Sequence, residues 1–167
     1  HLIHQMVPDN TSPEVSIQCY QSYQKHYDGN SQNKTKPYDG ILNLLNQLKE
    51  KTINLAVVSN KFDTSVKSLC QDYFADYIQI AIGESPNVAR KPAPDSVYTA
   101  IKELHADIEK VIYVGDSDVD VYTAHNAGIP CIAVTWGFRD RVVLEKSGAD
   151  FIIDNPDELF SCLLHKC

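Results

Sequence analysis

Two aspartates in the segment VGDSDVD, residues 114–120, are spaced so that their carboxylates could meet at one point. The apolar run that ends at Asp116 predicts a strand, and Asp120 lies four residues further on, one turn into a predicted helix. Positions i and i+4 share one face of a helix, and neighbouring carboxylates repel each other unless they share a proton or a cation. Because Mg²⁺ is usually bound through one or two carboxylates, waters and phosphate oxygens, the spacing predicts a magnesium site. Alternatively, Asp116 is a turn residue and Asp118 or Asp120 caps the helix.

Ser59 and Asn60 follow another apolar run, in the segment VVSNK. They provide a hydroxyl and an amide where a predicted strand passes into a helix, and free backbone N–H groups at a helix start can bind phosphate. Taken alone, the pair is better explained as a cap of the next helix.

Lys91 lies in the segment ARKPAPD, residues 89–95, between two predicted elements. The proline that follows it favours an extended backbone, which keeps the ammonium out of the next helix and could direct it, as a point charge, at a phosphoryl group. An isolated lysine is more often a solvated surface residue. The place of this K-P-x-P segment at the expected edge of a sheet favours the phosphate interpretation.

The elements that would position these residues alternate along the chain. Apolar runs predict strands over residues 53–59, 77–83, 110–116, 131–136 and 150–154. Helical spacing of apolar residues predicts helices over residues 38–50, 63–74, 94–106, 118–127, 139–147 and 156–165, with Asp63 as a candidate N-cap. Such alternation predicts an α/β fold with a doubly wound parallel sheet. Ligands of these sheets bind at the carboxyl ends of the strands, where Ser59, Lys91 and Asp116 are expected.

The first 35 residues differ in composition from the rest, because they are polar and rich in Gln, Asn and Tyr. Their apolar residues follow helical spacing, at Val15, Ile17, Tyr20, Tyr23 and Tyr27. The polar segment over residues 28–36 is expected to be flexible. We therefore expect two parts, residues 1–35 and 36–167.

The overall composition limits the class of protein. The 167 residues are 43% hydrophobic and carry a formal net charge of −7, which argues against a broad nucleic-acid-binding or anionic-membrane surface. A small anionic substrate stays compatible with this charge, because a local basic pocket can override the average. No run approaches the roughly 20 apolar residues of a membrane-spanning helix. The five cysteines include no C-x-x-C pair, so we expect reduced thiols rather than a disulfide framework or a zinc site.

The order of the three polar segments resembles motifs two, three and four of the haloacid dehalogenase-like (HAD) phosphohydrolases. KPYDGILNLLNQLKEKTINLAVVSNK is similar to the stretch that enters motif two in the phosphoglycolate-phosphatase branch. IYVGDSDVDVYTAHNAGIPCIAVTWGF is similar to its motif-four segment, including the T-W-G-F after the next strand. The resemblance covers nearly the whole chain and implies a Rossmann-like core with helical cap elements at the N-terminus.

The resemblance also implies roles for the residues. Ser59 would hydrogen-bond the transferring phosphoryl group, with Asn60 helping to place the substrate. Lys91 would neutralise the developing charge, Asp116 would be a direct Mg²⁺ ligand and Asp120 a ligand or a partner of one. The implied reaction is Mg²⁺-dependent hydrolysis of a small phosphomonoester, with phosphoglycolate as the first candidate, in a cytoplasmic enzyme with no nucleic-acid or membrane partner.

The nucleophilic aspartate of this family belongs to a first motif, D-x-D-x-T/V, and no such motif precedes the first strand-like run. Residues 1–35 instead resemble the last helices of a cap domain inserted after that motif. We therefore expect that the intact protein has a further strand in the middle of the sheet, which carries an aspartate that forms an aspartyl-phosphate. The chain as given is expected to be inactive.

Several alternatives stay open from the residues alone. A phosphomutase or a pyrophosphatase would share the same motifs. A non-catalytic phosphate- or partner-binding domain would lack the nucleophile but has no reason to keep Ser59, Lys91, Asp116 and Asp120 together. A response-regulator-like receiver is less consistent, since no acidic pair lies near the N-terminus.

Overall fold

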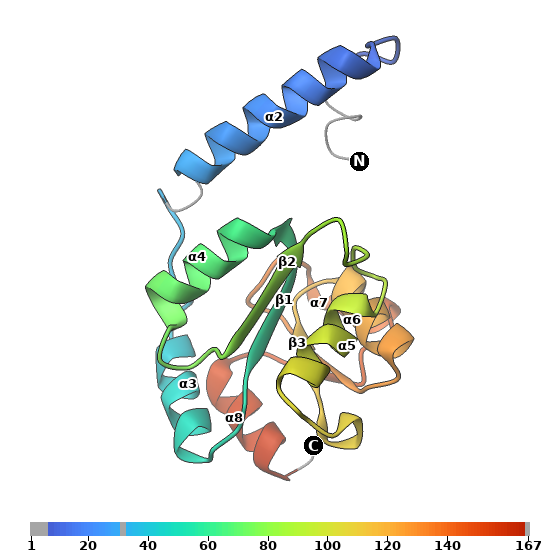
Figure 1. Cartoon of the computed structure of the whole chain (residues 1–167). Coiled ribbons are helices and arrows are strands. Elements are labelled where there is room, and N and C mark those ends of the chain that lie inside the picture. The colour runs from blue at the N-terminus through green and yellow to red at the C-terminus, as the bar shows by residue number, and fades with distance from the viewer. Residues whose placement is uncertain (1–6, 31–32, 166–167) are drawn as a thin grey trace. The chain divides into compact units, whose positions relative to one another are not determined.

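The structure is a computed structural model that describes residues 7–30 and 33–165, and the chain divides into two compact units, residues 1–36 and 37–167 (Figure 1). In the first unit, helix α2 (Pro13–Asn30) is longer than expected. The Asn30 side chain donates a hydrogen bond to the carbonyl of His26, four residues earlier in the same helix (2.8 Å). Residues 28–30, predicted to be flexible, are therefore helical. Whether this unit is part of a cap domain stays a prediction.

The second unit alternates strands and helices, as predicted. Its strands are β1 (Ala56–Phe62), β2 (Ile80–Glu84), β3 (Tyr113–Gly115), β4 (Cys131–Val134) and β5 (Phe151–Ile153). Its helices are α3 (Ile41–Glu50), α4 (Asp63–Phe74), α5 (Asp95–Glu103), the 3₁₀ helix η1 (Ile108–Lys110), α6 (Asp118–Ala127), α7 (Arg141–Lys146) and α8 (Pro156–His165).

All strand pairs are parallel, but the sheet consists of two pieces. β1 pairs with β2, and β3, β4 and β5 form a separate sheet in that order. In the part of the chain that the structure describes, β1, β2, β3 and β5 each pair with one strand only, so each has a free edge. The predicted parallel α/β class is confirmed.

Strand β4 is the centre of the core, because its side chains are buried on both faces. Cys131 and Ala133 face a cluster to which α5, α6 and α7 contribute Val97, Val121 and Leu144. Ile132 and Val134 face the opposite cluster, which contains Leu44 and Leu48 of α3 and Leu159 of α8. Alternate residues of a strand point to opposite faces, so helices cover both sides, as expected for a doubly wound sheet.

Three helices have the predicted bounds, whereas several strands are shifted. β1 continues beyond Ser59 to Phe62, because Phe62 still pairs with Glu84 of β2 across an irregularity in the register. Asp63 is not the N-cap of α4 but its first residue, and its side chain accepts a hydrogen bond from the Gly83 N–H (2.9 Å). Its carboxylate therefore links the helix to the end of β2.

Two further features concern the chain as a whole. No helix among the described residues is long and apolar enough to cross a membrane. Cys19, Cys70 and Cys131 are free, but Cys162 is disulfide-bonded. The expectation of reduced thiols throughout is therefore wrong at Cys162.

Candidate functional site

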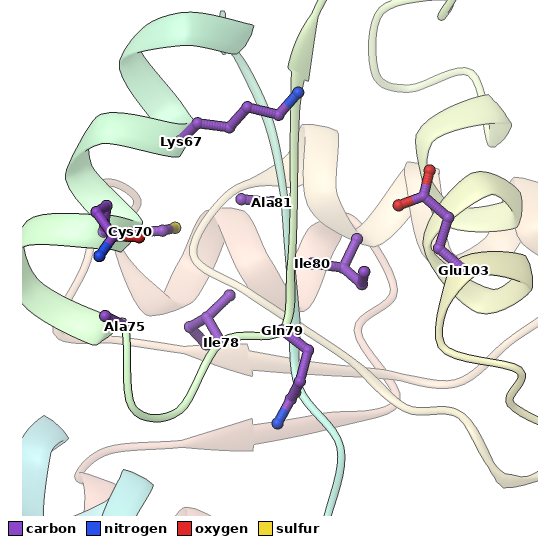
Figure 2. A pocket seen from close by; sticks show the side chains of 9 residues that line it. Lys67, Cys70, Ala75, Ile78, Gln79, Ile80, Ala81 and Glu103 are labelled. Atoms are coloured by element: carbon purple, nitrogen blue, oxygen red, sulfur yellow. The ribbon is translucent and has the colours of Figure 1, made fainter.

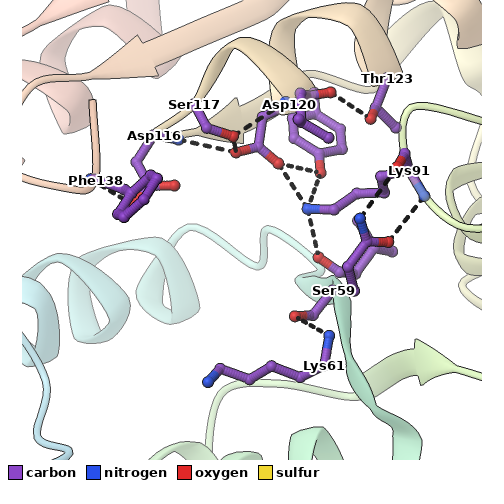
Figure 3. Close-up of polar contacts among 12 residues, drawn as sticks. Ser59, Lys61, Lys91, Asp116, Ser117, Asp120, Thr123 and Phe138 are labelled. Atoms are coloured by element: carbon purple, nitrogen blue, oxygen red, sulfur yellow. Dashed lines mark hydrogen bonds and ion pairs between the residues drawn. The ribbon is translucent and has the colours of Figure 1, made fainter. Parts of the chain in front are cut away.

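The predicted polar segments meet at the carboxyl ends of β1 and β3, where Lys91 lies at the centre (Figure 3). Its ammonium donates to Oδ1 of Asp120 (2.6 Å), to the Tyr113 hydroxyl (3.2 Å) and to the main-chain carbonyl of Val58 (3.3 Å). An ammonium has three donors, so all of them are used. Lys91 thus connects β1 with β3 and α6, and only 13% of its side chain is exposed.

Asp120 is an acceptor of protein hydrogen bonds through both of its carboxylate oxygens. Oδ1 accepts from Lys91 and from the Tyr113 hydroxyl (3.0 Å), and Oδ2 accepts from the Ser117 hydroxyl (2.6 Å) and the Asp116 N–H (3.3 Å). Burial acts to raise the pKa of Asp120, but the ammonium of Lys91 and these hydrogen bonds outweigh it, so the pKa lies below its usual value. Asp120 is therefore ionised at neutral pH and holds together residues from three elements.

Tyr113 is a member of the site that the sequence analysis did not identify. Its side chain is buried, and its hydroxyl donates to Asp120 and accepts from Lys91. Burial, and then the negative charge of Asp120, raise the pKa of Tyr113, so the hydroxyl keeps its proton. A tyrosine in a buried strand needs a polar partner for its hydroxyl, and this was the signal in the segment KVIYVGD.

Asn60 contacts the main chain of Lys91 with both polar atoms of its amide. The Lys91 N–H donates to Oδ1 of Asn60 (2.9 Å), and the Asn60 amide nitrogen donates to the Lys91 carbonyl (3.1 Å). Ser59, one residue earlier on β1, accepts a hydrogen bond from the N–H of Lys61 (3.1 Å). The predicted trio of Ser59, Asn60 and Lys91 is therefore brought together, with the Asn60 amide occupied by the Lys91 peptide.

Asp116 is half-buried and has one carboxylate oxygen in use. Oδ2 accepts from the N–H of Phe138 (2.9 Å), whereas Oδ1 has no hydrogen bond to any described residue. The described residues include no group of three or more His, Cys, Asp and Glu side chains that could hold a metal ion. This is compatible with Mg²⁺, which is commonly bound through one or two carboxylates together with water and phosphate oxygens. Asp116, with its open oxygen, fits such a site.

The charged neighbours of the site have other partners. Asp118 forms an ion pair with Arg139 (2.8 Å), and Arg90 forms one with Glu84 (3.1 Å) at half-exposed positions. A separate hollow of about 280 Å³ lies along the outer side of β2 (Figure 2). Its lining includes Lys67 and Glu103 but none of the predicted site residues, so the candidate site is elsewhere.

The chain is similar to several known proteins over most of its length. A phosphoglycolate phosphatase from Agrobacterium fabrum is 32% identical over 160 residues, which cover 92% of this chain and 66% of that protein. One from Aquifex aeolicus is 33% identical over 138 residues, which cover 82% and 63%. A crystal structure from Lactobacillus delbrueckii subsp. bulgaricus, with a provisional assignment as a phosphoglycolate phosphatase, has a TM-score of 0.86 and 36% identity, with coverage of 94% and 66%.

The chain thus spans about two thirds of the length of these relatives. Residues 3–134 match the haloacid dehalogenase-like hydrolase family. Together with the parallel α/β fold and the polar cluster at its strand ends, this match shows that the chain belongs to the haloacid dehalogenase-like hydrolases.

Proposed function

We propose that the whole protein is a Mg²⁺-dependent phosphatase that hydrolyses a small phosphomonoester, with phosphoglycolate as the first substrate to test. The observation that carries the proposal is the cluster of Lys91, Asp116 and Asp120 at the carboxyl ends of β1 and β3. Preorganised charges of this kind stabilise the transition state of phosphoryl transfer. The two relatives named phosphoglycolate phosphatases support the choice of substrate.

Lys91 is proposed to bind an oxygen of the transferring phosphoryl group. All its donors are in use, so one bond must be exchanged, and the bond to the Val58 carbonyl is the longest of the three (3.3 Å). Asp120 would keep its shorter bond and hold the ammonium in place. The Ser59 hydroxyl is proposed to donate to a second phosphoryl oxygen.

Asp116 is proposed as the Mg²⁺ ligand, through the oxygen that has no protein partner. The ion would supply positive charge to the phosphate oxygens. Asp120 is proposed to act on the ion only indirectly, because both of its oxygens already accept hydrogen bonds from the protein. Asn60 is proposed to hold the Lys91 backbone rather than contact the substrate, because its amide is engaged by that peptide.

The nucleophile is proposed to come from a further strand in the full-length protein. The free edges of β1 and β3 support this, and the Lys91 ammonium lies between the two strands, bonded to the Val58 carbonyl of β1 and to the Tyr113 hydroxyl of β3. Val114 of β3 is also 41% exposed, although its strand lies next to the most buried strand of the core. A parallel strand between β1 and β3 would cover it, and an aspartate at its carboxyl end would lie beside Lys91.

Phosphate release from phosphoglycolate by the full-length protein tests the proposal. We expect activity that requires Mg²⁺ and is abolished by Asp116→Asn, with the fold retained; an unchanged rate in this variant would remove the metal assignment. The chain of residues 1–167 alone is expected to show no turnover. If the full-length protein instead interconverts sugar phosphates faster than it hydrolyses phosphoglycolate, it is a phosphomutase. If it hydrolyses pyrophosphate faster, it is a pyrophosphatase. Full-length protein that binds inorganic phosphate without turnover would indicate the non-catalytic alternative.

A further inference from the structure

The segment that follows β4 contacts Asp116 through a glycine. A side chain at Gly137 would overlap the Cβ and Oδ2 atoms of Asp116. A Cβ atom at position 137 would lie closer to the Asp116 atoms than Cβ atoms in proteins ever lie to their neighbours. Only glycine therefore lets the main chain lie against the Asp116 side chain. This requirement concerns space and not backbone conformation.

The same segment then donates two main-chain hydrogen bonds to Asp116. The Phe138 N–H donates to Oδ2 (2.9 Å), and the Arg139 N–H donates to the Asp116 carbonyl (3.1 Å). A bond from an N–H to a carboxylate is stronger than one between neutral groups. Side chain and backbone of the aspartate are therefore both held by one short segment that lies 22 residues away in the sequence.

Burial of its side chain does not account for the position of Phe138. The Phe138 side chain is 75% exposed, although it is labelled beside Asp116 in Figure 3. Its ring instead contacts the guanidinium of Arg139 (4.8 Å), which also forms the ion pair with Asp118 (2.8 Å). The attachments of Phe138 and Arg139 that the structure records are thus to each other and to residues 116–118.

We propose that Gly137 is a positioning residue for the cation site, and this inference rests on the proposed function. By admitting the Phe138 N–H to Oδ2, Gly137 fixes the rotation of the Asp116 carboxylate and leaves Oδ1 open to a divalent cation. A free carboxylate would have to be ordered when the cation binds, whereas this one is ordered beforehand. Loss of such a supporting contact typically lowers metal affinity by about 10- to 100-fold.

The test is a Mg²⁺ titration of ¹⁵N-labelled full-length protein, followed by the amide resonances of Phe138 and Arg139 and by the exchange rate of the Phe138 amide. In the parent protein we expect both resonances to shift with Mg²⁺ and the Phe138 amide to exchange slowly. In Gly137→Ala we expect faster exchange and a Mg²⁺ affinity about 10- to 100-fold lower. Gly29→Ala is the matched control, because no atom lies within 4 Å of its added Cβ.

Two further variants separate the possible results. Phe138→Pro removes the N–H donor without adding atoms at position 137, so it should also weaken Mg²⁺ binding. This variant replaces Gly137→Ala in the test if Gly137→Ala does not fold. Asp116→Asn keeps an oxygen acceptor for the Phe138 N–H, so slow exchange should persist while the response to Mg²⁺ is lost. Normal Mg²⁺ affinity in a folded Gly137→Ala or Phe138→Pro protein would overturn the inference and leave the proposed function standing. No Mg²⁺ response in the parent protein would overturn both.

Discussion

The ammonium nitrogen of Lys91 lies 2.6 Å from Oδ1 of Asp120, and both side chains are largely buried, with exposures of 13% and 8%. Two charges in such surroundings are stable only as a pair with further hydrogen bonds. Tyr113 provides one of these bonds to each partner. The pair therefore joins a loop, a strand and a helix that are distant in the sequence.

Removal of one charge should be costly. We expect Lys91→Met to lower the free energy of unfolding by about 3–5 kcal/mol, because a buried carboxylate loses its counter-charge. In the double variant Lys91→Met/Asp120→Asn, the loss should be smaller than the sum of the single losses. Urea unfolding curves measure these changes. Lys110→Met is a control, since the pair of Lys110 with Asp107 is exposed and should contribute less than about 1 kcal/mol. Additive single effects would contradict the coupling.

The Tyr113 hydroxyl can be tested separately from its ring. Tyr113→Phe keeps the packing but removes a donor from Asp120, so it should lower the free energy of unfolding by about 1–3 kcal/mol. Tyr98→Phe provides the comparison, because the Tyr98 hydroxyl makes a long bond to the Asn126 carbonyl (3.5 Å) and its side chain is exposed. Equal losses in both variants, measured by thermal unfolding, would argue against a special role for Tyr113.

Asn60 is expected to affect the chemical step more than substrate binding. If the full-length protein has the proposed activity, Asn60→Ala should release the Lys91 backbone and lower kcat, by up to about 100-fold if the ammonium moves by 1 Å, with little change in KM. Steady-state kinetics with phosphoglycolate provide both values. A raised KM with unchanged kcat would instead show that Asn60 contacts the substrate. Ser59→Ala, at the neighbouring position, tests the proposed contact of the Ser59 hydroxyl with a phosphoryl oxygen.

The pH dependence of stability should include a contribution from Asp150. The Cys131 N–H donates to the Asp150 carboxylate (2.8 Å). This bond and the contact with His125 outweigh the effect of burial and hold the pKa of Asp150 below its usual value. Because the folded-state pKa is lowered, ionised Asp150 stabilises the folded protein at pH values above its unfolded-state pKa of about 3.9. This stabilisation is lost as the pH falls through the folded-state pKa. Asp150→Asn should therefore make the free energy of unfolding less dependent on pH in the acidic range. If urea unfolding curves give the same dependence of the free energy of unfolding on pH in the acidic range for Asp150→Asn as for the parent protein, the prediction is wrong.

The sequence was sufficient to predict the fold class and the polar strand ends, because both follow from local patterns. The bounds of α4, α6 and α8 agree with the helical spacing of their apolar residues. The partners within the site could not be predicted, because they depend on how distant segments pack. The bonds of Asn60 to the Lys91 peptide join residues 31 apart. No local propensity tells whether Asn60 holds the Lys91 backbone or contacts the substrate.

The division of the sheet does not follow from local composition, and only the further middle strand expected from the family resemblance implied a gap. β1 and β3 both have the apolar composition of buried strands, and composition does not tell which neighbour a strand has. The role of Gly137 was also hidden, because it depends on the space beside Asp116 and not on its own backbone conformation.

The free edges of β1 and β3 have a practical consequence for handling the protein. Among the described residues, β1 and β3 each have one edge whose main-chain N–H and C=O groups are not paired with another strand. Such edges are templates on which extended peptides add by hydrogen bonding. Purified protein consisting of residues 1–167 should therefore aggregate more readily at high concentration than a version in which a parallel strand fills the interval, and light scattering of the two preparations would display the contrast.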